Sequence, residues 1–217
     1  MSLTLYAHPF SSYSQKVLIA LWENEVSFTY RHMEHEGAAN ELMRLWPERK
    51  FPVLVDGTDT VVETSIIIEY LDQTRPGPVR FLPDEPKAAL EVRLLDRFFD
   101  LYVMTPVQRA VAEALRSSPD RLPEARENAA EALETAYGWL EARLRGRSWA
   151  GGEHWSLADC AAAPSLFYAD WVHRIGPIHP WLLDYRKQLL ERPSVARAVE
   201  EGRPYRHYFP LGAPDRD

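Results

Sequence analysis

The spacing of hydrophobic and polar residues divides the chain into two parts of different kind. Over residues 3–72, short apolar runs with the period of a strand alternate with runs that have the period of a helix, whereas the pattern after residue 87 is helical throughout. The two parts are separated by a segment with four prolines and a glycine, which neither a helix nor a central strand tolerates: Pro76, Gly77, Pro78, Pro83 and Pro86. We therefore predict a domain at residues 1–76, a linker at residues 77–86 and a second domain at residues 87–217.

The first domain is predicted to be a small mixed sheet with helices on its faces. In chain order its elements are a strand at residues 3–6, a helix at 14–23, a strand at 27–31, a helix at 40–45, strands at 53–55 and 61–62, and a helix at 64–72. The first βαβ connection requires its two strands to pair in parallel. The resulting order, βαβαββα, predicts a thioredoxin-like α/β fold.

The second domain is predicted to be all-helical. Apolar residues recur at helical spacing from Leu90 to Tyr102 and from Leu133 to Leu144, and further helices are expected at residues 180–190 and 194–201. Pro106 is expected to bend the first of these helices. One more helix should begin after Ser156, because Ser156 and Asp159 have the spacing of a capping box, and it should be buried.

Composition and charge restrict the classes of protein to which the chain can belong. The chain has 217 residues, of which 46% are hydrophobic and 26% are charged, as in an ordinary globular protein. Its 25 Lys and Arg residues against 32 Asp and Glu residues give a net charge of −7, which argues against nucleic-acid binding. No membrane-length apolar run and no targeting segment is recognised, so we expect no membrane partner.

The single cysteine, Cys160, rules out an internal disulfide and a Cys-x-x-Cys redox pair. We expect a cytoplasmic, reducing environment. Cys160 follows the predicted capping box on a helix that looks buried, which favours core packing over reactivity.

The most informative stretch for function runs from Lys50 to Asp72. Pro52 cannot donate to a sheet ladder, so it should lie where an exposed strand begins and backbone groups are free. Glu63 and Thr64 precede a segment of helical spacing, and the unpaired N–H groups at such a helix start attract a carboxylate. Together these features predict a pocket for a small γ-glutamyl peptide.

This stretch resembles the glutathione-binding half of the soluble, bacterial-like glutathione S-transferases. In that family a cis-proline precedes the strand that pairs with the cysteinyl part of glutathione, and an acid or amide followed by Ser or Thr binds the γ-glutamyl part. The resemblance implies binding roles for Phe51, Pro52, Val53, Glu63 and Thr64. Lys50 is expected to meet the glycyl carboxylate. The capping-box residues Ser156 and Asp159, preceded by Gly151 and Gly152, resemble a folding motif of the family's helical domain, so the resemblance reaches both domains.

A glutathione enzyme must favour the thiolate, because a thiol of pKa about 8.5 is only slightly ionised at neutral pH. A hydrogen bond from one hydroxyl can lower that pKa by roughly one to two units. Residues 11–14 read Ser-Ser-Tyr-Ser and resemble the Ser-Ser-Cys-Ser motif of the zeta class, one of the serine-type (zeta- or theta-like) classes. The match implies that Ser11 activates the thiol and that Ser12 supports it. Tyr13 replaces the cysteine of the zeta motif, which argues against the zeta isomerase reaction.

Other interpretations of these residues stay open. Ser11 is also a favourable helix cap whatever the function, and Glu63 and Thr64 are common at helix starts. Tyr6 and Tyr13 are rivals to Ser11, since tyrosine-type classes of the family activate the thiol from a Tyr at the end of the first strand.

No metal site is predicted. His32 and His35, with Glu34 between them, lack a third or fourth ligand at a plausible spacing.

The sequence therefore predicts a glutathione S-transferase that conjugates glutathione, its co-substrate, to a small hydrophobic electrophile. The resemblance also implies a homodimer. Two alternatives remain: a glutathione-dependent isomerase or dehalogenase on the same site, and a non-catalytic binding or interaction protein with the same fold.

Overall fold

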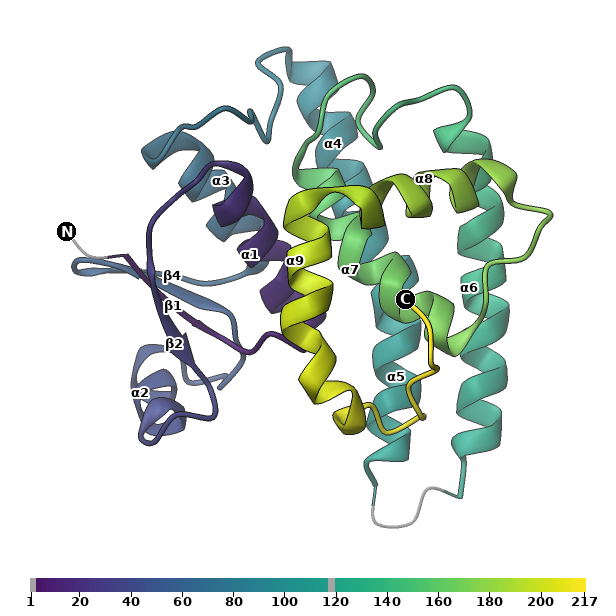
Figure 1. Cartoon of the computed structure of the whole chain (residues 1–217), viewed down its shortest axis with the longest axis horizontal. Coiled ribbons are helices and arrows are strands. Elements are labelled where there is room, and N and C mark those ends of the chain that lie inside the picture. Colours follow the sequence, from purple (N-terminus) through teal and green to yellow (C-terminus); the bar gives the residue numbers. More distant parts are fainter. Residues whose placement is uncertain (1–2, 117–119) are drawn as a thin grey trace.

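A computed structural model describes residues 3–116 and 120–217; Met1 and Ser2, which begin the first predicted domain, and residues 117–119 lie outside this description (Figure 1). The thioredoxin-like domain contains β1 (Leu3–Ala7), α1 (Ser12–Glu23), β2 (Thr29–His32), α2 (Ala38–Leu45), β3 (Val53–Asp56), β4 (Asp59–Val61) and α3 (Thr64–Thr74). The helical domain contains α4 (Pro86–Phe98), the π-helix η1 (Phe99–Met104), α5 (Thr105–Ala114), α6 (Leu122–Leu144), α7 (Leu157–Val172), α8 (Pro180–Glu191), α9 (Pro193–Gly202) and the 3₁₀ helix η2 (Arg203–Tyr208).

The sheet has the strand order β2-β1-β3-β4. β1 pairs with β2 in parallel and with β3 antiparallel, and β4 pairs antiparallel with β3. The predicted fold class, a thioredoxin-like domain followed by a helical domain, is confirmed. In the described part of the chain, no helix combines the length and the apolar character needed to cross a membrane.

The two domains share one continuous core. In Figure 1, α1 lies between the sheet and α9, and α1 packs against α3, α7 and α9. Almost every residue of α7 is buried, as expected of a helix that is apolar on all sides. The capping box at its start is confirmed, because the N–H of Ser156 donates to Asp159 Oδ2 at 2.8 Å. Asp159 also accepts from the Tyr185 hydroxyl at 2.7 Å, which ties α8 to the same point.

The segment between the domains is packed rather than loose. Residues 75–85 form no helix or strand, yet Phe81 is completely buried and its N–H donates to Asp72 Oδ1 at 2.9 Å. The helical domain begins at Pro86, which we had assigned to the linker. Proline suits this place because the first turn of a helix leaves its N–H groups without partners in any case.

The irregularity near Pro106 is a π-helix rather than a simple bend. η1 separates α4 from α5, and Pro106 lies in the first turn of α5. Insertions of this kind change which side chains a helix presents, and they are frequent at functional sites. Here Asp100, Leu101 and Met104 of η1 line a cavity that lies between the two domains.

Candidate functional site

A cavity of about 690 Å³ lies between the two domains. The thioredoxin-like domain contributes the loop before α1, the segment before β3 and the start of α3. The helical domain contributes α4, η1, α5, α7 and the chain end after η2. Seven of the eight predicted site residues line this cavity: Ser11, Ser12, Lys50, Phe51, Pro52, Glu63 and Thr64.

Ser11 is the N-cap of α1. Its backbone is extended, with φ −83° and ψ 123°, and its Oγ accepts the N–H of Ser14 at 3.3 Å. The capping interpretation is therefore confirmed. A hydroxyl has one donor and two acceptor sites, so capping leaves the hydrogen of Ser11 available to a ligand. Capping and donation to a thiolate are thus compatible.

The loop that carries Ser11 is fixed from both domains. The Tyr168 hydroxyl of α7 donates to the carbonyl of Phe10 at 2.8 Å, and the Gln15 amide donates to the carbonyl of Pro9 at 2.8 Å. Gly202, at the end of α9, comes so close that an added Cβ would lie 3.2 Å from the Pro9 carbonyl oxygen. These contacts set the direction of the Ser11 side chain.

Ser12 lies next to Ser11 but is differently placed. It is buried, and its Oγ has no hydrogen-bond partner among residues 3–116 and 120–217. Ser12 nevertheless belongs to the residues that line the cavity.

The two tyrosines considered as rivals to Ser11 differ in position. The Tyr6 hydroxyl donates to Glu41 Oε2 at 3.1 Å, and Tyr6 does not line the cavity. Tyr13 does line it. Burial, followed by the negative charge of Asp100, raises the pKa of Tyr13 to about 12, so its phenol stays protonated at neutral pH.

The Phe51–Pro52 peptide bond is cis, and both residues line the cavity. The side chain of Val53 is completely buried, and Val53 is paired with Tyr6 of β1 and does not line the cavity. Only the backbone of Val53 could therefore meet a ligand, which is the contact that we expect. Phe51, on the other side of Pro52, does line the cavity, so its backbone is a second candidate for the same contact. The side chain of Lys50 is 75% exposed at the edge of the cavity.

Glu63 is held in an unusual backbone conformation at the start of α3. Its φ is 67° and its ψ is 120°, outside the regions that a residue with a Cβ prefers. Its side chain does not cap α3, so the simple structural explanation for an acid at this position fails. Strain of this kind persists where the surrounding structure enforces it, and it is concentrated at ligand sites. Thr64 is buried beside it and supplies the first N–H of the helix.

A buried charge cluster joins the domains behind the cavity. Lys16 of α1 is 1% exposed, and its Nζ lies 2.6 Å from Asp96 Oδ1 and 2.9 Å from Asp100 Oδ2. The Ser65 hydroxyl donates to Asp96 at 2.6 Å. Burial raises the pKa of Asp100, and the nearby Lys16 opposes that rise. The sequence analysis missed this cluster. A lysine within the apolar run of α1 was the only local signal.

The part of the cavity wall that the helical domain forms was not predicted residue by residue. It combines apolar side chains with Gln108 and Arg97, and its apolar members are Leu101, Met104, Val107, Val111, Leu115, Phe209 and Pro210. Trp46 and Arg49, from the segment before β3, also line the cavity. The helical spacing of several of these residues is visible in the sequence, but the spacing does not say which side of a helix faces a cavity.

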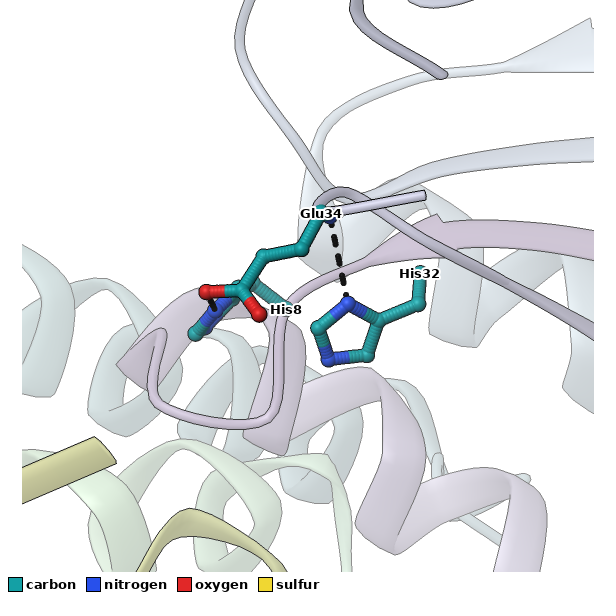
Figure 2. Close-up of side chains that lie close together, drawn as sticks. All are labelled: His8, His32 and Glu34. Atoms are coloured by element: carbon teal, nitrogen blue, oxygen red, sulfur yellow. Dashed lines mark hydrogen bonds and ion pairs between the residues drawn. The ribbon is translucent and has the colours of Figure 1, made fainter. Parts of the chain in front are cut away.

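The histidine cluster near the cavity has a member that the sequence analysis did not consider. Figure 2 shows Glu34 between His8 and His32. Ligand atoms of these three side chains lie within 4.8 Å of one another. His8 follows β1 and His32 ends β2; because these strands pair in parallel with Ala7 opposite His32, the two imidazoles come together.

The comparison with protein families matches both domains. Residues 5–79 match the family model "Glutathione S-transferase, N-terminal domain", and residues 123–188 match "Glutathione S-transferase, C-terminal domain". The two matches together span more than half of the chain.

Individual relatives are distant but similar over their full length. A probable maleylacetoacetate isomerase from Vibrio cholerae is 28% identical over 94% of this chain and 98% of its own. FtsZ-localized protein A from Caulobacter vibrioides is 27% identical over 96% of this chain and 97% of its own. The crystal structure of a glutathione S-transferase from Methylobacterium radiotolerans in complex with glutathione sulfonate has a TM-score of 0.75 and 26% identity, covering 92% of this chain and 95% of that one.

Proposed function

The chain belongs to the soluble glutathione S-transferase family, and from that premise we propose that it joins the thiol of glutathione to a small hydrophobic electrophile. The observation that carries the proposal is Glu63. It is a carboxylate at the cavity, in a strained backbone conformation and without a capping role. A free carboxylate in this position suits the ammonium group of a γ-glutamyl ligand.

The charges around the cavity match those of glutathione group by group. Glu63 pairs with the γ-glutamyl ammonium, while the Thr64 hydroxyl and the N–H groups at the start of α3 bind the adjacent α-carboxylate. The backbone of Phe51, next to Pro52, pairs with the cysteinyl residue. Lys50 binds the glycyl carboxylate, and Arg49 beside it adds a second positive charge.

Ser11 stabilises the thiolate in this proposal, and Ser12 supports it. The Ser11 hydroxyl donates to the sulfur, and the N-terminus of α1 adds a favourable field. The thiolate then forms a carbon–sulfur bond to the electrophile, the leaving group departs with its electron pair, and the thiol proton passes to solvent. Ser11 and Ser12 resemble the serine-type classes of the family, and we keep that subclass as part of the proposal.

A second candidate, an isomerase or dehalogenase on the same site, is favoured by the similarity to the probable maleylacetoacetate isomerase. In such a reaction the thiolate adds to the substrate and is released again. A third candidate is a non-catalytic interaction protein of the same fold; the resemblance to FtsZ-localized protein A, whose name refers to location rather than to a reaction, supports it.

We also propose that the protein is a homodimer. Several apolar side chains on α3, α4 and η1 are exposed, namely Ile66, Leu90, Leu94, Leu101 and Tyr102. Leu90 is 65% exposed and Leu94 is 49% exposed, which suits a surface covered by a second copy. The variant Leu90→Glu/Leu94→Glu should run as a monomer in light scattering after size exclusion, where the native protein runs as a dimer. A cytoplasmic location remains part of the proposal, supported by the single buried Cys160.

The decisive experiment combines a calorimetric titration of the protein with glutathione and mass spectrometry of its reaction with an aromatic halide. We expect stoichiometric binding and a glutathione conjugate with loss of halide. Glutathione recovered unchanged after turnover of an unsaturated diacid would instead support the isomerase. Binding without turnover of either substrate would support the interaction protein, and no binding at all would contradict the proposal.

A further inference from the structure

A hydrogen-bonded cluster beside the cavity connects the end of the helical domain to the thioredoxin-like domain. Tyr208 ends η2 and lines the cavity, and its hydroxyl donates to Glu34 Oε1 at 2.9 Å. Glu34 lies in the loop after β2, and the same oxygen lies 3.3 Å from Nε2 of His8. Glu34 therefore joins a residue of the cavity wall to the segment that leads into Ser11.

The backbone donors around the two imidazoles fix where their protons lie. Nδ1 of His8 accepts the N–H of Phe10 at 3.2 Å, and Nδ1 of His32 accepts the N–H of Glu34 at 3.2 Å (Figure 2). A neutral imidazole that accepts at Nδ1 carries its hydrogen on Nε2. The Nε2–H of His8 consequently donates to Glu34, and that of His32 points to the Tyr205 hydroxyl at 3.3 Å.

Two imidazoles and a carboxylate also form a ligand set that Zn²⁺ uses. A metal-bound imidazole coordinates through a nitrogen without hydrogen and donates through its other N–H to an acceptor. In this cluster both Nδ1 atoms face N–H donors instead. Coordination through Nε2 would turn each Nδ1 into a donor that opposes the N–H of Phe10 or Glu34. The hydrogen bonds therefore favour a structural cluster over a metal site.

The charge states of the two central groups suit this arrangement. Hydrogen bonds from Tyr208 and then from His8 lower the pKa of Glu34, so the carboxylate is ionised at neutral pH. The same bond raises the pKa of Tyr208, which keeps its hydroxyl protonated as the donor. Tyr208 is otherwise half-exposed, at 51%. Its nearest aromatic neighbour is His207, and the centroids of the two rings lie 4.2 Å apart.

We propose that Glu34 is a positioning residue that holds Tyr208 against the cavity and thereby limits the size of electrophile that the cavity accepts. This inference rests on the proposed transferase function. The argument is geometric: Tyr208 is followed by Phe209 and Pro210, which also line the cavity, so the bond to Glu34 fixes one side of the electrophile end to the thioredoxin-like domain. Without this bond, the half-exposed ring is free to rotate into solvent and the electrophile end widens.

The test uses Glu34→Ala, which removes the acceptor of the Tyr208 hydroxyl, and Tyr208→Phe, with Glu36→Ala as the matched control. Glu36 is an exposed acid of the same loop, and its carboxylate has no hydrogen bond or ion pair within the described residues. We expect the first two variants to raise the KM for 1-chloro-2,4-dinitrobenzene roughly five- to tenfold and to lower it for a bulkier bromomethylnaphthalene. The KM for glutathione and the kcat should change less than about twofold, and the double variant should show no further change.

A second measurement does not depend on transferase activity. Amide hydrogen exchange at residues 205–210 should become faster in Glu34→Ala and Tyr208→Phe and stay unchanged in Glu36→Ala. If glutathione binding fails while the exchange result holds, the proposed function is wrong but the positioning role survives. Unchanged exchange in Glu34→Ala, or an equal loss of affinity for glutathione and electrophile, would overturn the role. Stoichiometric Zn²⁺ binding in calorimetry that is lost in Glu34→Ala would overturn it in favour of a metal site.

Discussion

The two ends of the cavity are built in different ways. The glutathione end consists of short segments of the thioredoxin-like domain, residues 49–52, 63–64 and 11–13, and its important groups are polar and fixed by the backbone. The electrophile end consists of side chains from several helices and from the chain terminus, and most of them are apolar. The first end can recognise one ligand by its charges, whereas the second end can select only by size and apolar character.

This difference means that a substitution should have a sharp and specific effect at the glutathione end and a graded one at the electrophile end. The two domains that form these ends are joined at Lys16 of α1 and at Asp96 and Asp100 of the helical domain. Substitutions at this junction, at the glutathione end and at the apolar wall of the electrophile end therefore test this difference in turn.

The largest effect is expected at the junction. Lys16→Met keeps the volume of the side chain, but within the described residues it leaves Asp96 buried without a counter-ion and Asp100 with Arg97 alone, at 3.6 Å. Removal of one partner of a buried ion pair costs about 3–5 kcal/mol, so we expect a loss of that size in the free energy of unfolding measured in urea. The control is Lys187→Met, which removes an exposed pair with Glu191 at 3.9 Å and should cost less than about 1 kcal/mol. Equal losses in the two variants would show that the junction does not hold the two ends together.

The next effect concerns activation of the thiol. Ser11→Ala should raise the pKa of bound glutathione by roughly one to two units, because the thiolate loses a donor while the thiol does not. The rate of conjugation depends on the thiolate, so the pH–rate profile should move by the same amount to higher pH. Tyr13→Phe is the control, because the pKa of Tyr13, raised to about 12, gives no ionisation in the measured range. A shift of the pH–rate profile in Tyr13→Phe and none in Ser11→Ala would show that Tyr13, and not Ser11, activates the thiol.

A somewhat smaller effect is expected for recognition of glutathione. Glu63→Gln removes the charge that faces the ligand ammonium and should raise the dissociation constant in calorimetry by roughly tenfold or more. Asp59→Asn, an exposed acid on β4 of the same domain, should leave it unchanged. The KM for the electrophile at saturating glutathione should stay constant in both variants. If Glu63→Gln changed both substrates alike, the two ends would not be independent.

The smallest effect is expected at the apolar wall. Val111→Ala removes two methyl groups from α5 at the electrophile end and should change kcat/KM for an aromatic halide by only about two- to tenfold. Val26→Ala, which shortens a half-buried side chain of the other domain, serves as the control and should change kcat/KM less than twofold. A loss of a hundredfold or more at Val111 would mean that the wall recognises its substrate as specifically as the glutathione end does.

The sequence was sufficient to propose the glutathione end, because the features that point to it are local. Pro52, Glu63 and Thr64 each have a conformational or charge requirement that a short segment shows, and the capping position of Ser11 could be read from a few residues. For Val53 the sequence does not say where the side chain lies, because a strand residue next to the proline can face either the core or the ligand. Only the pairing of β3 with β1 shows that it is buried.

The electrophile end could not be obtained in the same way. Asp100 and Met104 line the cavity together with residues of α4 and α5, and the sequence does not say which side of these helices faces it. His8 was not connected with His32 because the parallel pairing of β1 and β2 brings together residues that are far apart in the chain. Lys16 looked like an ordinary polar residue until its two acidic partners were seen in the other domain.

The sequence by itself thus determined the fold class and indicated the residues of the proposed glutathione end, because strand period, helix caps and turn residues act over a few neighbouring positions. The tertiary structure alone decided which helix faces form the electrophile end, which charges are buried at the junction, and that Glu34 meets Tyr208 across the domains. These contacts join residues that are distant in the chain, and their formation depends on how whole helices pack, which no local pattern encodes.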